Sequence, residues 1–305
     1  MNTALAYLIV IAVWATTPLA IKWSGEALPP LAAAGARMAC AALLGLVWLA
    51  ARRQPLPLHR HALLSYVAAL PGIFGAMGCS YMAARDLPSG LISVMFGLAP
   101  LISGIFLQLV PGGFRLNRWH WLACLLGVAG LALVFDDSLA SLLRGDPGQR
   151  GRGLLWMLCA VTLFAGSGIV VQRVGAGLAP MAQTVGGLLL SVPLYGLALW
   201  ASGQGLAFSG AARGLFAIAY LATFGSLLGF YCYFQVLTRM PAATVALVTL
   251  ITPVLALLLG ASLNDERLGV PVLAGTSLIV MALGLYLLGD RRVRRRVVST
   301  TIDDG

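Results

Sequence analysis

The architecture of this chain is indicated by two apolar stretches, PSGLISVMFGLAPLISGIFLQLV (residues 88–110) and PAATVALVTLITPVLALLLGASL (residues 241–263). Each stretch begins with a proline and holds a second proline twelve residues later: Pro88 and Pro100, then Pro241 and Pro253. A bilayer core of roughly 30 Å requires about 20 mostly apolar residues per helix, so both stretches are long enough to cross it. The shared proline spacing predicts an internal repeat with an offset of 153 residues.

The repeat extends into neighbouring segments of the chain. Further residues match at the same offset or, near the start, at an offset of 150: Gly72 with Gly225, Cys79 with Cys232, Tyr81 with Phe234, Gly25 with Gly175, Pro30 with Pro180, and Trp14 with Phe164. Each half is therefore predicted to hold five helices. Because five is odd, the second half would cross the membrane in the opposite sense, as in the inverted repeats of many secondary transporters.

Composition supports a membrane location for the whole chain. Hydrophobic residues make up 60% of it and charged residues only 10%, whereas a soluble domain carries about a quarter charged residues. Ten apolar runs are long enough to serve as spans, with these approximate bounds: 3–23, 30–51, 62–84, 88–110, 119–135, 153–174, 180–201, 215–238, 241–263 and 270–289.

The sequence thus predicts an all-α integral membrane protein with ten transmembrane helices in two inverted five-helix repeats around a central cavity. Its predicted parts are a first repeat at 1–136, a connecting loop at 137–152, a second repeat at 153–289 and a basic tail at 290–305.

Arginine predicts the orientation. One side of the predicted membrane collects 12 of the 20 basic residues, including five arginines of the tail. Loops rich in lysine and arginine stay in the cytoplasm, so both termini are expected there. The tail is expected to touch anionic membrane lipid rather than nucleic acid.

Several marks together resemble the EamA family of the drug/metabolite transporter superfamily. Trp14 is followed eight residues later by Lys22, Arg37 lies seven residues into the second span, and Glu266 follows span nine. The matching position in the first half is Gly113, so the acidic mark is absent there. The resemblance covers nearly the whole chain. It implies a carrier in the bacterial inner membrane, often an exporter of amino acids or other small metabolites, with a central cavity and no cofactor.

Charges within spans are candidate substrate contacts because burying one at the bilayer centre costs about 2.5–3.5 kcal/mol. Arg37 is predicted roughly 10 Å below the outer surface, where it either satisfies a neighbouring helix break or contacts an anionic group. Lys22 is either a cavity residue or an anchor at the end of span one. No acidic residue falls in the middle of a predicted span, which disfavours a proton-coupled exporter of organic cations.

Breaks in helices mark the expected depth of the binding site. Pro18 follows Thr17 in span one, and an interior proline removes a hydrogen bond and kinks a helix. The matching stretch in the second half centres on Ser167 between two glycines. Pro100 and Pro253 form a second pair of predicted kinks. Freed carbonyls at these places need partners, so they line a cavity or pack tightly.

Aromatic and amide side chains complete the candidate site. The candidates are Trp14, Tyr81, Phe96, Phe164, Gln172, Tyr231 and Phe234. For any one aromatic residue the alternative is core packing or an interfacial belt.

The predicted function is a secondary carrier for a small organic metabolite, most plausibly an amino acid or a similar neutral, zwitterionic or anionic solute, acting in export by alternating access. The alternatives are a membrane scaffold or lipid-handling protein and, less favoured, a membrane-embedded enzyme. The sequence has no GxxxxGK[ST] motif, and its three histidines lie outside the spans or at a span edge, away from any serine they would activate. No metal site is expected, and a monomer and a homodimer both remain open.

Overall fold

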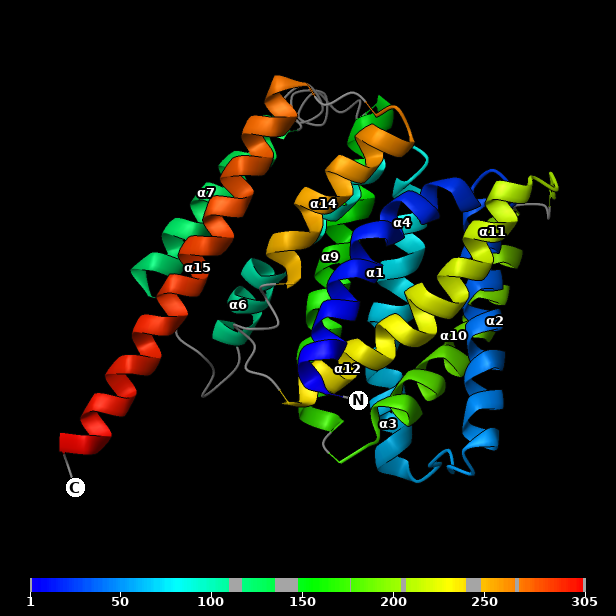
Figure 1. Ribbon diagram of the computed structural model, residues 1–305, viewed down its shortest axis with the longest axis horizontal. Helices are drawn as coiled ribbons and strands as arrows, with labels where there is room; N and C mark the ends of the chain where they lie inside the picture. Colours follow the sequence, from blue (N-terminus) through cyan, green and yellow to red (C-terminus); the bar gives the residue numbers. More distant parts are fainter. Residues whose placement is uncertain are drawn as a thin grey trace.

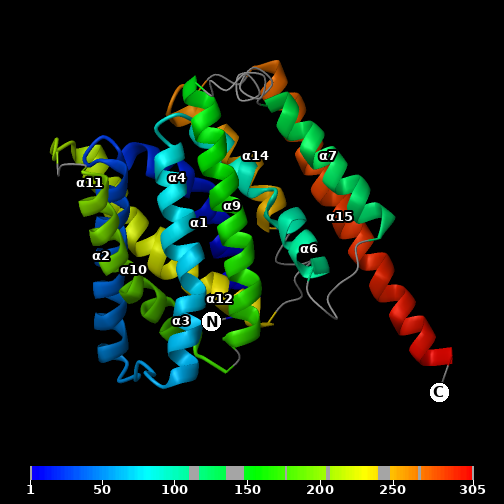
Figure 2. The same cartoon turned by 180° about the vertical axis from the view of Figure 1, so that it is seen from behind.

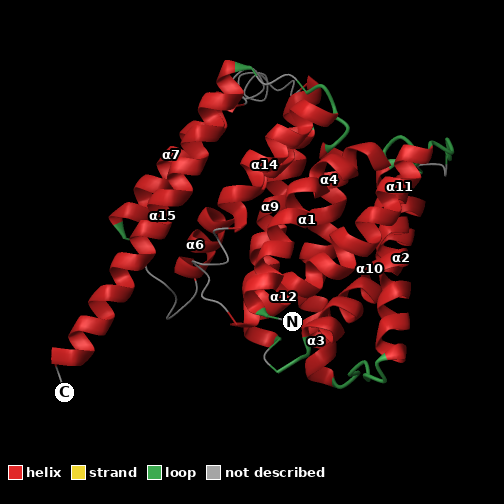
Figure 3. Ribbon diagram, viewed as in Figure 1, coloured by secondary structure: helices red, strands yellow, loops and turns green. Residues whose placement is uncertain are grey.

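A computed structural model describes residues 2–109, 117–134, 148–175, 177–203, 207–239, 248–266 and 269–303 of the protein. Within these residues all regular structure is helical, which confirms the all-α prediction (Figure 3). In chain order the elements are α1 Thr3–Ser24, α2 Pro30–Ala51, α3 Arg60–Leu70, η1 Pro71–Ala76, α4 Met77–Ala83, α5 Ser89–Phe96, α6 Ala99–Leu109, α7 Arg118–Val134, α9 Gly148–Val174, α10 Pro180–Ser202, α11 Ala212–Tyr220, η2 Leu221–Leu228, α12 Gly229–Arg239, α14 Val248–Leu263 and α15 Val270–Asp303.

Eight helical stretches of the described chain are long and apolar enough to cross a membrane. They are Thr3–Ser24, Pro30–Ala51, Arg60–Ala83, Ser89–Gln108, Gly148–Val174, Pro180–Ser202, Ala212–Arg239 and Val270–Gly289. Two shorter apolar helices, Arg118–Val134 and Thr252–Leu263, correspond to the fifth and ninth predicted spans. The start of the ninth predicted span and most of the predicted loop at 137–152 lie outside the described residues. The protein is therefore multi-pass, and the count of ten stays a prediction.

Two of the long stretches contain a π-helical segment, in which the backbone hydrogen bonds skip one extra residue. The first, η1, joins α3 to α4, and the second, η2, joins α11 to α12. Gly72 lies in η1 and Gly225 in η2, so the two segments overlap at the 153-residue offset of the sequence repeat. Both halves thus have the same irregular turn at matching positions.

Helices from the two halves of the sequence pack against each other. Helix α1 contacts α14, α12 and α11, and helix α2 contacts α10 and η2. Helix α9 in turn contacts η1, α4 and α3. The core cluster of buried apolar side chains accordingly draws on both halves. Neither half forms a separate bundle in the described residues.

Helices α7 and α15 form a pair at the edge of the molecule, beside the main bundle (Figures 1 and 2). They approach closely because each helix has a glycine where they cross, Gly130 in α7 and Gly275 in α15. A β-carbon on Gly130 would lie 2.6 Å from the carbonyl oxygen of Gly275. Nearer the other end of the pair, Asn117 Nδ2 donates a hydrogen bond to the Gly289 carbonyl at 3.2 Å. The start of α1 and the end of α15 lie toward the same end of the bundle (Figure 1).

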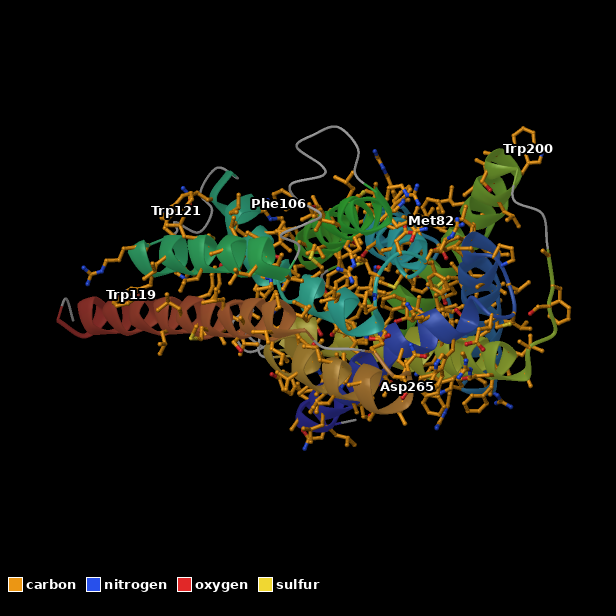
Figure 4. The ribbon with its side chains drawn as sticks, turned by 90° about the horizontal axis from the view of Figure 1, so that it is seen from above. Met82, Phe106, Trp119, Trp121, Trp200 and Asp265 are labelled. Carbon is orange, nitrogen blue, oxygen red and sulfur yellow. The ribbon has the colours of Figure 1, made fainter. Side chains whose placement is uncertain are left out.

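Large apolar side chains cover the outside of the helices, as expected of a protein surrounded by lipid. Trp121 is 49% exposed on α7, and Trp200 is 80% exposed at the end of α10, where it projects from the bundle (Figure 4). An exposed tryptophan near a helix end is typical of the interfacial aromatic belt.

Candidate functional site

A cavity of about 60 Å³ lies among helices from both halves. That volume holds roughly four to six waters. Its walls come from α1, α2, α4, α5, α9, η2, α12 and α14, and the lining residues are Trp14, Thr17, Pro18, Ile21, Arg37, Met77, Ile92, Ser93, Phe96, Phe164, Gly225, Phe230 and Thr252. The wall is mostly apolar, with one charge and a few hydroxyl groups, as is usual for small-molecule sites.

The one charge is Arg37, which α2 carries into the interior. Its side chain is 1% exposed. The Nε atom donates a hydrogen bond to the Ser226 hydroxyl in η2 at 2.7 Å, and that hydroxyl lies 3.6 Å from the Met38 sulfur. The Nη1 atom is buried and has no hydrogen-bond partner in the described chain.

Aromatic rings form another side of the cavity. The Trp14 and Phe164 rings meet edge to face with their centroids 5.7 Å apart, and Phe96 meets Phe164 in the same way at 5.6 Å. Behind them Tyr233 packs 5.2 Å from Trp14 and 5.4 Å from Phe164. Edge-to-face packing is a favoured arrangement of aromatic rings, so these contacts stabilise the orientation of the rings in the apolar wall.

A group of polar contacts joins helix ends at one end of the bundle. Lys22 Nζ donates to the Leu87 carbonyl at 3.0 Å, and Trp23 Nε1 donates to Asn264 Oδ1 at 3.1 Å. The Glu266 carboxylate accepts from the backbone amides of Ser89 at 2.8 Å and Gly90 at 3.2 Å. A carboxylate is stabilised at a helix N-terminus by the unpaired amides and the helix dipole. These contacts, which we call the end latch, tie α1, α5 and α14 together.

Six of the residues proposed from the sequence line the cavity. They are Trp14, Thr17, Pro18, Arg37, Phe96 and Phe164. The Thr17 hydroxyl donates to the Val13 carbonyl at 2.7 Å, one turn before the buried Pro18. Their proximity follows from the way α1, α2, α5 and α9 converge; contact with a substrate stays a prediction.

The other proposed residues lie elsewhere. Tyr81 and Phe234 are buried in the core, Tyr231 packs on the small cluster around Leu49, and Gln172 is exposed. Ser167 donates to the Ala68 carbonyl at 2.8 Å, where it packs α9 against α3, and Lys22 belongs to the end latch.

Of the proposed kinks, only Pro18 borders the cavity. The chain turns at Gly97–Leu98 between α5 and α6, just before Pro100. Pro253 lies inside α14 without a break. The cavity wall is formed beside it by Thr252.

Sequence reasoning did not place Met77 and Phe230 at the cavity, although a signal was present. The two residues are 153 positions apart, and both line the wall, as do Trp14 and Phe164 at the offset of 150. Extending the 153-residue offset to every large apolar residue near Tyr81 and Phe234 would have identified Met77 and Phe230 as a matched pair. Ile92, Ser93 and Thr252 have no such signal, because they depend on how α5 and α14 pack together.

Comparison with known proteins places these features in a wider group. A family model described as "EamA-like transporter family" matches residues 1–136 and 151–288. The chain is 27% identical over 294 residues to "Uncharacterized inner membrane transporter YedA" of Escherichia coli (strain K12), covering 96% of this chain and 93% of that protein. It is 24% identical to "Uncharacterized transporter sll0355" of Synechocystis, covering 91% of this chain and 87% of the relative.

A solved structure titled "Crystal structure of protein" is similar in fold. It has a TM-score of 0.66 and 20% sequence identity, and the match covers 95% of this chain and 98% of the other. The overall fold therefore has a counterpart among solved structures.

Proposed function

Since the chain belongs to the EamA-like transporter family, we propose that this membrane transporter is a secondary carrier that exports a small organic solute across the bacterial inner membrane by alternating access. The observation that carries the proposal is the cavity, because its wall combines α1, α2, α4 and α5 of the first half with α9, η2, α12 and α14 of the second. A relative movement of the halves would change which side of the membrane the cavity faces.

The proposal includes ten spans in two inverted repeats, with both termini in the cytoplasm. The matching π-helical segments η1 and η2 support the repeat. The positions of α1 and α15, which place both chain ends toward the same end of the bundle, support an even number of spans (Figure 1). Reporter fusions at both termini test this: a periplasmic reading at the C-terminus alone would mean an odd number of spans and break the repeat.

The substrate class follows from the charges. The acidic residues of the sequence fall outside the middle of the predicted spans, and Arg37 lies in the cavity wall. A cavity whose one charge is positive repels an organic cation, and it accepts a neutral, zwitterionic or anionic solute. The family and the names of its relatives favour a transporter over an enzyme.

The test is a resistance screen. The chain is overexpressed in a bacterium that is challenged with toxic concentrations of amino acids, their analogues and other metabolites. Rescue by the wild type but not by Arg37→Ala, at equal membrane abundance, would identify the exported class. If rescue fails for every solute tested while the protein is inserted and folded, export is the wrong direction or the proposed function is wrong, and uptake assays then separate the two.

A further inference from the structure

Arg37 is a buried cation without a counter-ion in the described part of the chain. Its side chain is 1% exposed, its described hydrogen bond goes to a neutral hydroxyl, and Nη1 is left without a partner. Leaving a charge buried and uncompensated is strongly destabilising. Intramembrane charges that persist at such a cost usually mark the path of a ligand or ion.

None of the carboxylates with described side chains pairs with Arg37; three of them have other partners and the fourth is exposed. Glu26 pairs with Arg213, whose Nε donates to Glu26 Oε2 at 2.9 Å, and Asp86 lies 3.8 Å from Arg152. The Glu266 carboxylate holds the α5 amides in the end latch. Asp265 is exposed at the edge of the bundle (Figure 4). Arg37 is in none of these pairs, so no carboxylate among these described side chains serves as its counter-ion.

The guanidinium has unused hydrogen-bonding capacity, because Nη1 is buried without a partner in the described chain. Ser226 occupies Nε and fixes the plane of the group. Gly225 of η2 packs closely against the guanidinium because it has no side chain: a β-carbon there would lie 3.1 Å from Nη2. A planar guanidinium with free N–H groups matches the two oxygens of a carboxylate, which it binds through paired charge-assisted hydrogen bonds.

The rest of the cavity wall fits an apolar body. Trp14, Phe96 and Phe164 supply ring edges and faces, and Ile21, Ile92 and Met77 supply aliphatic surface. The wall's remaining polar groups are hydroxyls and the Trp14 indole N–H, and it includes no carboxylate to receive an ammonium group. An ammonium in such a wall would meet aromatic rings but no opposite charge, and it would be repelled by Arg37.

We infer that the cavity binds a small organic monoanion, with its carboxylate on the Arg37 guanidinium and its apolar body against Trp14 and Phe164. The inference rests on the proposed function, since it assigns the solute class of the same cavity. It is narrower than that function in two respects: it requires one negative group, and it excludes a positive one.

A binding experiment tests the inference without relying on transport. The purified full-length chain in lipid nanodiscs is titrated calorimetrically at neutral pH with benzoate, benzamide and benzylamine, which share a ring and differ in charge. Benzoate is expected to bind, benzamide to bind at least tenfold more weakly, and benzylamine not to bind. Butanoate and butanamide repeat the comparison with a smaller body.

Variants identify the site. A hydrogen bond to a charged group contributes about 1.5–3 kcal/mol, so Arg37→Met is expected to weaken benzoate binding roughly 10- to 100-fold and to leave benzamide unchanged. Arg37→Lys keeps a point charge but loses the planar fork, and it is expected to fall between the two. Arg60→Ala removes an exposed arginine far from the lining residues and serves as the matched control for net charge.

Each outcome decides the matter. Equal affinity for benzoate and benzamide, benzoate binding that survives Arg37→Met, or no carboxylate binding by the wild type would overturn the inference. Chloride or phosphate that binds as tightly as benzoate would overturn the apolar-body part. If Arg37→Met does not fold, Ser226→Ala, which keeps the charge but frees Nε, is expected to weaken benzoate binding severalfold, and no change would count against the inference. Carboxylate binding without any transport would contradict the proposed function alone, whereas transport of amines that does not depend on Arg37 would contradict the inference alone.

Discussion

The π-helical segments η1 and η2 occupy matching positions in the two halves, yet the side chains that contact them differ. At η1 the Tyr195 hydroxyl of α10 lies 3.3 Å from the Ile73 carbonyl and donates to the Phe74 carbonyl at 2.9 Å, and the Tyr195 and Phe74 rings pack 4.8 Å apart. At η2 the neighbour is Arg37 of α2, which bonds to a side chain, Ser226, and borders the cavity.

The contrast extends to single matched positions. At the 150-residue offset Arg37 corresponds to Gly187, and at the 153-residue offset Ser226 corresponds to Ile73. Gly187 packs against Ile73 so closely that a β-carbon would lie 2.6 Å from the Ile73 Cδ1 atom. One half thus has an apolar, tightly packed contact where the other has a charge and a hydroxyl. Both halves thus have the π-helical turn, while among the described residues η2 borders the cavity and η1 does not.

The most severe way to break this contrast is Gly187→Arg, which puts a charge at the packed position. Burying it beside η1 is expected to destabilise the protein by at least about 3 kcal/mol, because no cavity or acceptor awaits it. Size-exclusion profiles of a fluorescent fusion, before and after heating, measure the loss. Gly187→Ala is the control for packing alone and is expected to lose far less, since only the end of Ile73 has to shift. Equal losses would show that charge is irrelevant there.

Arg37 tests the other side of the contrast. We expect Arg37→Ala to lower transport by about 100-fold and Arg37→Lys by about tenfold, because lysine keeps a point charge but not two parallel donors. Initial rates of solute movement, normalised to the amount of folded protein in the membrane, give the comparison. If both variants transport like the wild type, Arg37 is a structural residue only.

Removing one hydroxyl from each segment separates stability from binding. Tyr195→Phe deletes the donor to the η1 carbonyls and is expected to cost about 1 kcal/mol, a fall in Tm of roughly 2–4 °C, with transport nearly unchanged. Ser226→Ala deletes the acceptor of Arg37 and is expected to weaken solute affinity severalfold with a smaller change in Tm. Thermal unfolding and concentration-dependent transport are measured on both. The reverse pattern would mean that η1, not η2, borders the working site.

The smallest expected effect is that of a proton gradient. Neither η1 nor η2 contains a carboxylate or histidine, and the acidic residues of the chain lie outside the middle of the predicted spans. Downhill flux in proteoliposomes is therefore expected to persist without a pH gradient, and adding one is expected to drive no accumulation. Uphill accumulation that an uncoupler abolishes would show a protonatable group at work and would direct attention to Asp86, His120 or Glu266.

Much of this arrangement follows from sequence, for reasons that individual residues make clear. Apolar runs of sufficient length predicted the helices, because a continuous apolar segment of about 20 residues satisfies its own backbone in lipid only as a helix. The match of Trp14 with Phe164 predicted two equivalent places near the centre, and these rings meet in the cavity wall. The sequence marked Arg37 as a charge within a span, but it did not decide between a helix break and an anionic group as the partner of the guanidinium.

Other features depend on packing that a single sequence does not encode locally. Gly72 and Gly225 were recognised only as matching positions of the repeat, since a glycine in a helix is compatible with a kink, a close contact or a π-helical turn. The acceptor of Arg37, Ser226, is 189 residues away in an otherwise apolar segment. The edge position of the α7–α15 pair also escaped prediction, because a side chain that faces lipid is as apolar as one that faces the protein.

The close crossing of Gly130 and Gly275 has a consequence for the order of synthesis. These residues are 145 positions apart, so at about 5–20 residues per second the ribosome reaches the second roughly 7–30 seconds after the first. During that interval α7 has been synthesised but α15, the helix that packs against it, has not. Helix α5 likewise waits for the carboxylate of Glu266. Helices of the first half are therefore completed by contacts with residues near the end of the second half. A ribosome that stalls before Val270 leaves α7 without its partner α15.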